Sequence, residues 1–234
     1  MIQKLIIGLM ALVLSVITPM VVLDHTRVAT DLQTLKDSSY QAYLGIVKLN
    51  KKLDFSTIRA ATRLLYVPEL GNGSGVMIAP GRMLTAAHVA KINKQMPLLL
   101  NGKQIKVLKI NEDLDLALLE VEEDCPCVPL AAELPVVDEK VYIVGFPVYQ
   151  EEMPQYLTEG RVQGTTKKYH RTLTSVPAAP GNSGGGLFVY VKDQWRLAGI
   201  LVSVSGIGGF FGSIPVFHVS HSVDLESIIK FLNE

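Results

Sequence analysis

The sequence predicts an all-β fold of two antiparallel β-barrels, with an apolar N-terminal helix and a short C-terminal helix. Three observations lead to this prediction. From residue 44 onward the chain is a series of short Val-, Ile- and Leu-rich segments broken by Gly, Asn and Pro, which is typical of strands. No long helical pattern separates these segments, which argues against an α/β arrangement. The length of 234 residues is sufficient for two small barrels that share a core.

The expected strands fall into two groups. They cover residues 44–49, 61–67, 74–79, 82–85, 104–110, 115–121, 140–145, 157–164, 171–176, 186–191 and 195–204. The stretch 122–140 is rich in Pro and acidic residues, so we expect a first barrel at about 44–121 and a second at about 141–222. Apolar residues at 225, 228, 229 and 232 have helical spacing, which predicts a terminal helix over 224–232 that packs on the barrels.

The N-terminus predicts a membrane-spanning helix. Residues 5–23 are 19 consecutive positions without a charge, between Lys4 and Asp24. At about 1.5 Å per residue such a helix crosses the ~30 Å hydrocarbon core, whereas the apolar region of a secretory signal has only about 7–15 residues. We therefore expect a signal anchor over residues 1–23, and the alternative is a cleaved signal peptide and a secreted protein. Lys4 is a positive-inside signal that places the rest of the chain on the extracytoplasmic side.

Residues 24–43 are expected to form a linker between this helix and the folded region. Leu32 and Leu35, followed by Tyr40 and Tyr43, suggest a short polar-faced helix or stalk. The folded region, residues 44–234, is then one domain that contains both barrels.

Charge and cysteine content exclude several classes of partner. Lys plus Arg and Asp plus Glu both number 22, so the chain has no net field that would attract nucleic acid. The two cysteines are Cys125 and Cys127, and a strained disulfide, a metal fragment and two unlinked thiols all remain open. A four-ligand zinc site would need further Cys or His residues nearby, and none is present. We expect neither a metal nor a cofactor.

Three distant segments carry the groups that activate a serine nucleophile: residues 85–88 (Thr-Ala-Ala-His), 113–119 (Asp-Leu-Asp-Leu-Ala-Leu-Leu) and 181–185 (Gly-Asn-Ser-Gly-Gly). A serine hydroxyl needs an imidazole to take its proton and a carboxylate to orient that imidazole. His88, Asp115 and Ser183 are the candidates. Their order, with separations of 27 and 68 residues, is that of the chymotrypsin architecture, in which two barrels meet at one cleft.

The glycines around Ser183 suit a tight nucleophile turn, because glycine tolerates unusual dihedrals and close approach. The backbone amides of Gly181 and Ser183 are expected to converge where the oxyanion of a tetrahedral intermediate would lie. Each such donor contributes roughly 3 to 4 kcal/mol of transition-state stabilisation.

These motifs, together with Gly73-Ser74-Gly75-Val76-Met77-Ile78, resemble the protease domain of the HtrA (Deg) branch of trypsin-like serine proteases. The resemblance runs from about Leu44 to the C-terminus and rests on four motifs in the same order. It implies two six-stranded antiparallel β-barrels of the chymotrypsin type, with His88 as general base, Asp115 as its orienting partner and Ser183 as nucleophile. Relatives in this branch often form trimers, which the resemblance suggests for this chain without identifying contact residues.

Two features depart from that branch. HtrA proteins usually carry a PDZ domain after the protease domain, and with the sequence ending at Glu234 we do not expect one. Gly186 stands where the branch often has proline or alanine, which would loosen the turn. Asn182 agrees with the branch, whereas digestive relatives have an aspartate there that pairs with a newly cut N-terminus, so activation by that route is not expected.

Other residues compete for some of these roles. Asp113 is a rival to Asp115, but the position directly before Leu-Ala is the one that the resemblance selects. We interpret His25, His170, His218 and His221 as surface or packing residues, and a substrate contact of His170 remains open.

The primary substrate pocket is predicted from its usual place around the nucleophile. The resemblance implies a lining of Pro177, Ala178, Leu201, Val202, Ser203, Val204, Gly212 and Ser213. This lining has no carboxylate, so basic side chains would remain unpaired, and we expect cleavage after small or medium aliphatic residues. The backbone of residues 202–204 is expected to pair with the substrate as an added strand.

The sequence therefore predicts a membrane-anchored serine endopeptidase that cleaves protein or peptide substrates through an acyl-enzyme. The alternative is a catalytically silent trypsin-like fold that acts as a membrane-tethered binding module. An esterase-type hydrolase is disfavoured by the order of the triad and by the strand pattern.

Overall fold

The computed structural model describes residues 30, 33, 34, 36–38, 53–69, 71–91, 97–124, 126–147, 154–209 and 212–234, with only the backbone for 206–209 and 212–217. The chain divides into two units, Met1–Leu53 and Asp54–Glu234. In the first unit the described residues between 30 and 38 are helical, and Thr34 Oγ1 donates to the carbonyl of Thr30 at 2.9 Å. The expected anchor at 5–23 and the expected strand at 44–49 lie outside the described residues. Within the described part of the chain, no helix is both long and apolar enough to cross a bilayer.

The second unit contains a closed six-stranded antiparallel barrel, as predicted for the second barrel. Around it the strands follow the order β10 (Arg171–Thr174), β13 (Gly212–Asp224), β12 (Gln194–Gly209), β11 (Gly186–Val191), β8 (Lys140–Gly145) and β9 (Tyr156–Thr166). Its interior is apolar and includes Ile143, Val162, Leu187 and Leu201. Within the closed part of the barrel each strand pairs on both sides, and this pairing holds the loops at its ends in fixed places.

The first group of strands forms a half-barrel, so the prediction of a closed six-stranded barrel was wrong here. Its seven strands lie in the order β5 (Lys103–Gln104), β4 (Leu99–Leu100), β1 (Thr62–Val67), β2 (Gly71–Ala79), β3 (Arg82–Thr85), β7 (Leu116–Glu120) and β6 (Lys106–Asn111). The two edge strands, β5 and β6, are separated along the chain only by Ile105. One short segment of the chain therefore provides both edges of this sheet, with β5 paired to β4 and β6 paired to β7.

Several strand limits agree with the sequence, and others do not. β3, β8 and β11 have the predicted limits, whereas the single expected strand 104–110 is divided into β5 and β6. β13 was missed, because its buried inward residues include the polar Ser220 and Ser222, both 0% exposed, and so hide the apolar alternation of a strand.

Two short helices, α2 (Ser56–Ala61) and α3 (Ala87–Ala90), were not predicted. Each is too short to show a helical period in the sequence. The terminal helix α4 (Leu225–Asn233) is close to its predicted limits. It begins after Asp224, whose carboxylate accepts a hydrogen bond from the Ser227 amide at 2.8 Å and so caps the first turn.

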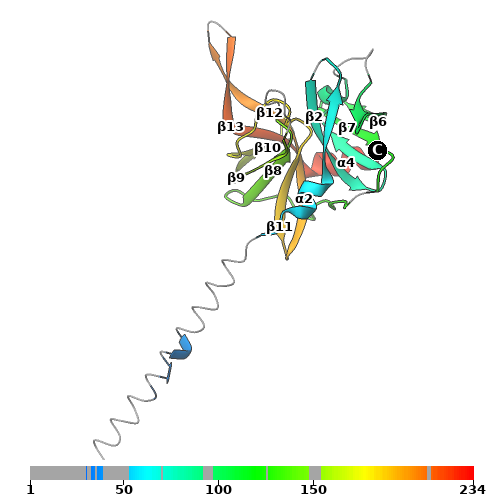
Figure 1. The fold of residues 1–234 in the computed structure, drawn as a ribbon. Coiled ribbons are helices and arrows are strands. Elements are labelled where there is room, and N and C mark those ends of the chain that lie inside the picture. The colour runs from blue at the N-terminus through cyan, green and yellow to red at the C-terminus, as the bar shows by residue number, and fades with distance from the viewer. Residues whose placement is uncertain are drawn as a thin grey trace, which may run out of the picture. The chain divides into compact units, whose positions relative to one another are not determined.

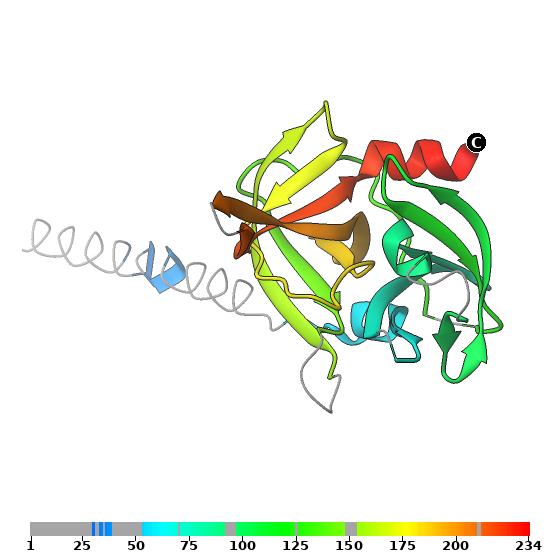
Figure 2. The same cartoon turned by 90° about the horizontal axis from the view of Figure 1, so that it is seen from above.

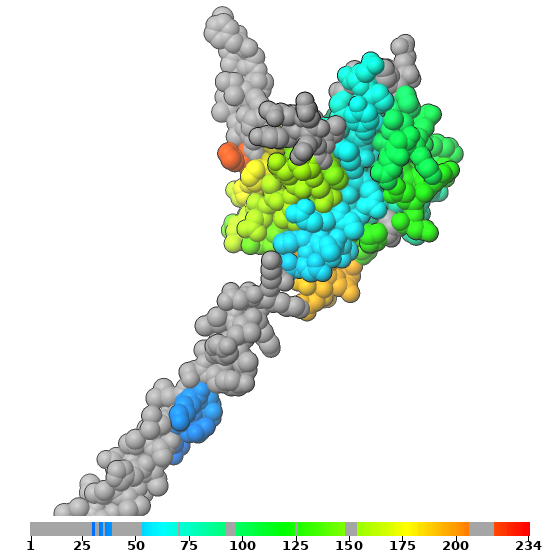
Figure 3. Space-filling view, in the orientation of Figure 1, coloured from blue at the N-terminus to red at the C-terminus, as the bar shows by residue number. Residues whose placement is uncertain are grey.

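The barrel and the half-barrel lie side by side (Figure 1). Helix α4 follows the last barrel strand and reaches toward the half-barrel (Figure 2), where Lys109 of β6 donates to the Phe231 carbonyl at 2.6 Å. At the opposite end, Trp195 Nε1 donates to the Asp54 carbonyl at 2.7 Å, and the ring of Phe55 lies 5.3 Å from that of Trp195. In the space-filling view the surface around α2 is continuous with that of the barrel strands (Figure 3). Contacts at both ends therefore fix the two halves of this unit against each other.

Candidate active site

His88 and Asp115 are joined by two hydrogen bonds. His88 lies in α3, directly after β3, and Asp115 ends the turn between β6 and β7. The imidazole Nδ1 lies 2.7 Å from Asp115 Oδ2, and the His88 backbone amide donates to Asp115 Oδ1 at 2.9 Å. With Nδ1 hydrogen-bonded to a carboxylate, Nε2 is the ring nitrogen left to accept a proton.

Asp115 has a positive φ of 57°, which an aspartate tolerates better than most residues. Antiparallel pairing of Thr85 with Ala117 brings the two segments into register. Side-chain exposure is 46% for His88 and 25% for Asp115, so the carboxylate is the more shielded partner. Asp113, the rival candidate, lies instead on a separate cavity with Leu114.

Ser183 lies in the turn before β11, against the segment that carries His88. The next residue, Gly184, has a φ of 86°, and a Cβ added there would lie 2.0 Å from the Ser74 carbonyl and 2.2 Å from Thr85 Oγ1. A side chain at 184 would therefore push the turn away from β2 and β3. The same turn is fixed by hydrogen bonds from the Gly184 amide to the Leu201 carbonyl, at 2.7 Å, and from the Leu201 amide to the Gly185 carbonyl, at 2.8 Å.

Among the described residues, Ser183 Oγ and His88 Nε2 form no hydrogen bond with each other. Catalytic hydrogen bonds are often long without substrate and tighten in the Michaelis complex. The structure thus brings His88 and Asp115 into direct contact, and it brings the turn of Ser183 against the His88 segment.

The Gly181 and Ser183 amides donate to no other group among the described residues. Their neighbours are engaged: the Asn182 amide donates to the Ala179 carbonyl at 3.1 Å, and the Gly185 amide to the Asn182 carbonyl at 2.8 Å. Gly181 has a φ of 91°, which favours glycine. These two amides therefore remain available to a ligand.

A cavity of about 300 Å³ opens beside Ser183. Its lining carries no charge and consists of Ala178, Ala179, Pro180, Ser183, Leu201, Ser203 and Val204. Four predicted pocket residues, Ala178, Leu201, Ser203 and Val204, are among them. Ala179 and Pro180 were missed, although their place directly before Gly181 was a signal in the sequence.

Four other predicted pocket residues do not line this cavity. Pro177 is exposed, and its carbonyl accepts a hydrogen bond from Thr158 Oγ1 at 3.0 Å. Val202 is 5% exposed, at a shift of register between β12 and β13. Gly212 and Ser213 pair with Gly209 and Gly208 at the far end of the β12–β13 hairpin. The bulge and the length of that hairpin could not be read from residue spacing.

Beyond Ile200, β12 has no strand partner on the side of β11 among the described residues, while its other side pairs with β13 up to Gly209. The backbone of residues 203–205 is thus an open edge next to the cavity. An extended peptide pairs with an edge of this kind.

Two further basic groups, Arg171 and His221, have pKa values that burial lowers. Burial lowers the pKa of Arg171, and the nearby carboxylates of Asp115 and Asp224 oppose this effect. Burial also lowers the pKa of His221, with a smaller effect of Arg171, and His221 Nε2 lies 2.7 Å from Ser205 Oγ. His170 lines a cavity of about 440 Å³ beside Arg171, which lies apart from the one at Ser183.

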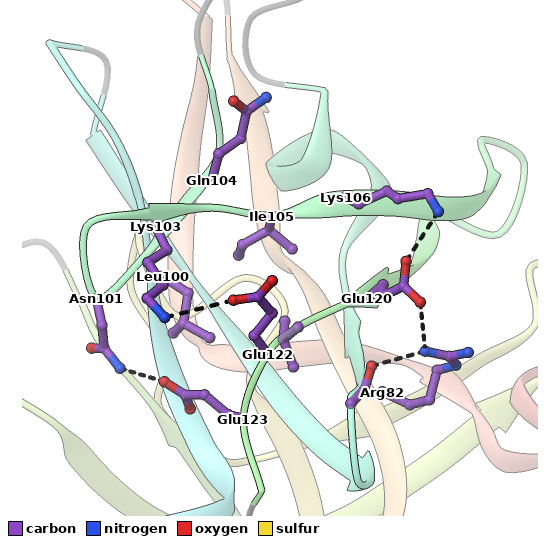
Figure 4. Close-up of a pocket in the computed structure, with 12 residues that line it drawn as sticks. Arg82, Leu100, Asn101, Lys103, Gln104, Ile105, Lys106, Glu120, Glu122 and Glu123 are labelled. Carbon is purple, nitrogen blue, oxygen red and sulfur yellow. Dashed lines mark hydrogen bonds and ion pairs between the residues drawn. The ribbon is translucent and has the colours of Figure 1, made fainter.

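A larger cavity, of about 520 Å³, contains none of the predicted catalytic residues (Figure 4). Its charged groups form pairs: Glu120 with Lys106 at 3.0 Å and with Arg82 at 3.3 Å, and Glu122 with Lys103 at 3.6 Å. This larger cavity therefore lies apart from the candidate catalytic residues.

The described residues contain no cluster of three or more His, Cys, Asp and Glu side chains suited to a metal. Cys127 is disulfide-bonded. The only other cysteine of the sequence, Cys125, lies outside the described residues.

Comparison with known proteins identifies the class. The chain belongs to the trypsin-like peptidase family, because the model of the trypsin-like peptidase domain matches residues 73–200, more than half of its length. It is accordingly a serine endopeptidase of the trypsin-like type. A search of curated protein sequences gave no match.

Solved structures share the fold at low identity. The active form of the Rv3671c protease from M. tuberculosis has a TM-score of 0.59 and 18% identity, over 76% of this chain and 81% of that one. The serine endoprotease from Yersinia pestis has a TM-score of 0.60 and 21% identity, over 78% and 66%. The HtrA-type protease AlgW, solved with a tripeptide, has a TM-score of 0.60 and 20% identity, over 77% and 63%. These structures support the predicted all-β, chymotrypsin-like architecture.

Proposed function

We propose that this serine endopeptidase uses His88, Asp115 and Ser183 as its catalytic triad. The observation that carries the assignment is the bidentate contact of Asp115 with His88, through Nδ1 at 2.7 Å and the backbone amide at 2.9 Å. It holds the imidazole with Nε2 as the proton acceptor, which is the tautomer a general base requires.

In the proposed reaction, Ser183 Oγ attacks the substrate carbonyl carbon while His88 Nε2 takes the hydroxyl proton. Asp115 stays ionised and stabilises the imidazolium that forms. The new oxyanion is bound by the amides of Gly181 and Ser183. The C–N bond then breaks as His88 returns the proton to the leaving amine. In the second half-reaction, His88 takes a proton from water while the water oxygen attacks the acyl carbon. The ester C–O bond then breaks as His88 returns this proton to Ser183 Oγ.

We propose a preference for small or medium aliphatic side chains at the cleavage position. The uncharged lining of the 300 Å³ cavity beside Ser183 supports this preference, because a buried Lys or Arg side chain there would meet no counter-charge. The open edge of β12 supports binding of the substrate as an extended strand.

We further propose that the protein is anchored in a membrane by residues 5–23, with the protease unit on the extracytoplasmic side. The support is the uninterrupted apolar sequence and Lys4 before it. Retention of the full-length protein in membranes after alkaline carbonate washing is the expected result, and its release would contradict the anchor.

The triad is tested by labelling the purified full-length protein with a fluorophosphonate. We expect labelling that disappears in Ser183→Ala and persists in Ser175→Ala, a neighbouring serine bonded within the barrel to the Arg161 amide. A folded wild-type protein that remains unlabelled would favour a silent binding module. A peptide library then tests specificity, and cleavage mainly after Arg or Lys would contradict the proposed preference.

A further inference from the structure

Ser74 forms hydrogen bonds with both sides of the nucleophile turn. It lies in β2, within the Gly73-Ser74-Gly75 motif, and it is 0% exposed. Its hydroxyl donates to the Gly181 carbonyl at 2.9 Å, and its backbone amide donates to the Ser183 carbonyl at 2.8 Å. The half-barrel thereby fixes two carbonyls of a turn that belongs to the other barrel.

These two contacts limit the direction of the Ser183 amide. Because a peptide unit is planar, fixing a carbonyl oxygen also fixes the N–H on its other side. Ser74 holds the peptide from Gly181 to Asn182 and the peptide from Ser183 to Gly184. The Ser183 amide belongs to the peptide between these two, so its direction is limited from both sides.

The hydroxyl has particular importance at Gly181. Glycine has no Cβ to restrict its dihedrals, so the Gly181 peptide can rotate at little cost unless a contact holds it. The hydroxyl of Ser74 is held in turn, because it accepts a hydrogen bond from the Phe146 amide at 2.9 Å. Its single proton is therefore directed at Gly181.

Ser74 is also connected to the segment that carries His88. Thr85 Oγ1 donates to the Ser74 carbonyl at 2.6 Å, and Thr85 lies three residues before His88 on the same chain. One buried residue thus links the base segment, the nucleophile turn and the loop that follows β8.

We propose that Ser74 is a positioning residue that, through the peptide units on either side, holds the Ser183 amide in the direction required to bind the oxyanion. This inference rests on the function proposed above. Ser74 does not touch the reacting atoms and acts through the turn. Removal of its hydroxyl should therefore lower turnover more than it affects substrate binding.

The test compares Ser74→Ala with Thr62→Val in the full-length protein. Thr62 is the matched control, because its buried hydroxyl also donates to a backbone carbonyl, that of Ile58 at 2.8 Å, in the same half of the unit. Three quantities are measured: kcat and KM on a peptide substrate, the melting temperature, and hydrogen–deuterium exchange of the peptide covering residues 180–186.

We expect Ser74→Ala to lower kcat by about 10- to 100-fold, a part of the ~10²–10³-fold effect of deleting one oxyanion donor, with KM changed by less than about threefold. Exchange of residues 180–186 should rise. Thr62→Val should lower the melting temperature but leave kcat and this exchange close to wild type.

A kcat of Ser74→Ala within about threefold of wild type, or unchanged exchange of residues 180–186, would overturn the proposal. Failure of the proposed function gives a different result: the wild type would then show no cleavage dependent on Ser183. If the wild type shows no such cleavage, hydrogen–deuterium exchange of Ser74→Ala still tests the positioning role. Faster exchange confined to residues 180–186 supports the role, and unchanged exchange contradicts it.

Discussion

Replacement of Gly184 by alanine should damage the nucleophile turn through a steric conflict that the structure locates. A Cβ at this position would lie 2.0 Å from the Ser74 carbonyl oxygen, 2.2 Å from Thr85 Oγ1 and 3.1 Å from the Ala86 amide nitrogen. Two of these three atoms are backbone atoms, and the Ser74 carbonyl already accepts a hydrogen bond from Thr85, so the turn itself has to move.

The magnitude has two parts. A φ of 86° costs an L-residue about 1 to 2 kcal/mol, and forcing an extra methyl group into a packed site costs about 1 to 3 kcal/mol. We therefore expect Gly184→Ala to lower the free energy of unfolding by about 2 to 5 kcal/mol. At roughly 2 to 4 °C per kcal/mol for a chain of this size, the melting temperature falls by about 4 to 20 °C.

The assay is thermal unfolding of the full-length protein, with Gly164→Ala as the matched control. Gly164 lies in β9, has no atom within 4 Å of an added Cβ and does not have a positive φ. Its replacement should change stability by less than about 1 kcal/mol. Equal melting temperatures for the two variants would refute the steric argument. Folded Gly184→Ala should also lose labelling by the fluorophosphonate, because the turn carries Ser183.

Three further predictions concern single polar groups. Asp115→Asn should lower kcat by about 10³- to 10⁴-fold, because an amide stabilises neither the required tautomer nor the imidazolium, whereas Asp113→Asn should retain activity. Loss of activity in Asp113→Asn with activity retained in Asp115→Asn would assign the orienting carboxylate to Asp113. Asn182→Asp should destabilise the fold by roughly 2 to 4 kcal/mol at pH 7, because the residue is 4% exposed and its Oδ1 has no hydrogen-bond partner among the described residues. Burial would raise the pKa of the new carboxyl, so the loss of folding stability should be full above its folded-state pKa and fade as the pH falls toward 4. Denaturant unfolding at pH 7 and at pH 4 checks this expectation, and a loss that does not depend on pH would contradict it. His221 has a pKa lowered by burial and by Arg171, so folding should lose stability as the pH falls below about 6.5, where the unfolded chain binds the proton first. His221→Gln should show a smaller decline in melting temperature between pH 7.5 and 5.5 than the wild type, and equal declines would oppose this reasoning.

Much of the chemistry could be predicted because it depends on residue identity. The motif around His88 and the one around Asp115 predicted a hydrogen bond between these two side chains, and the structure contains it. The missing carboxylate in the predicted pocket lining agrees with the uncharged cavity beside Ser183.

The rest of the site depends on contacts that no local pattern records. Ala179 and Pro180 line the cavity, while Pro177, whose carbonyl accepts a hydrogen bond from Thr158, does not. Ser74 was part of a quoted motif, but its two bonds to Gly181 and Ser183 span more than 100 residues of sequence. Such contacts exist only once both halves of the unit have folded.

The same division holds for the fold. The sequence by itself determined the strand class, the limits of β3, β8 and β11 and the terminal helix, because alternation and helical periodicity are properties of neighbouring residues. Only the tertiary structure decided that the first sheet is a half-barrel of seven strands, that β12 and β13 form a long hairpin with bulges, and that Ser74 holds the nucleophile turn. The physical reason is that strand partners and buried hydrogen bonds are chosen by packing between distant segments, where backbone groups must all be satisfied at once.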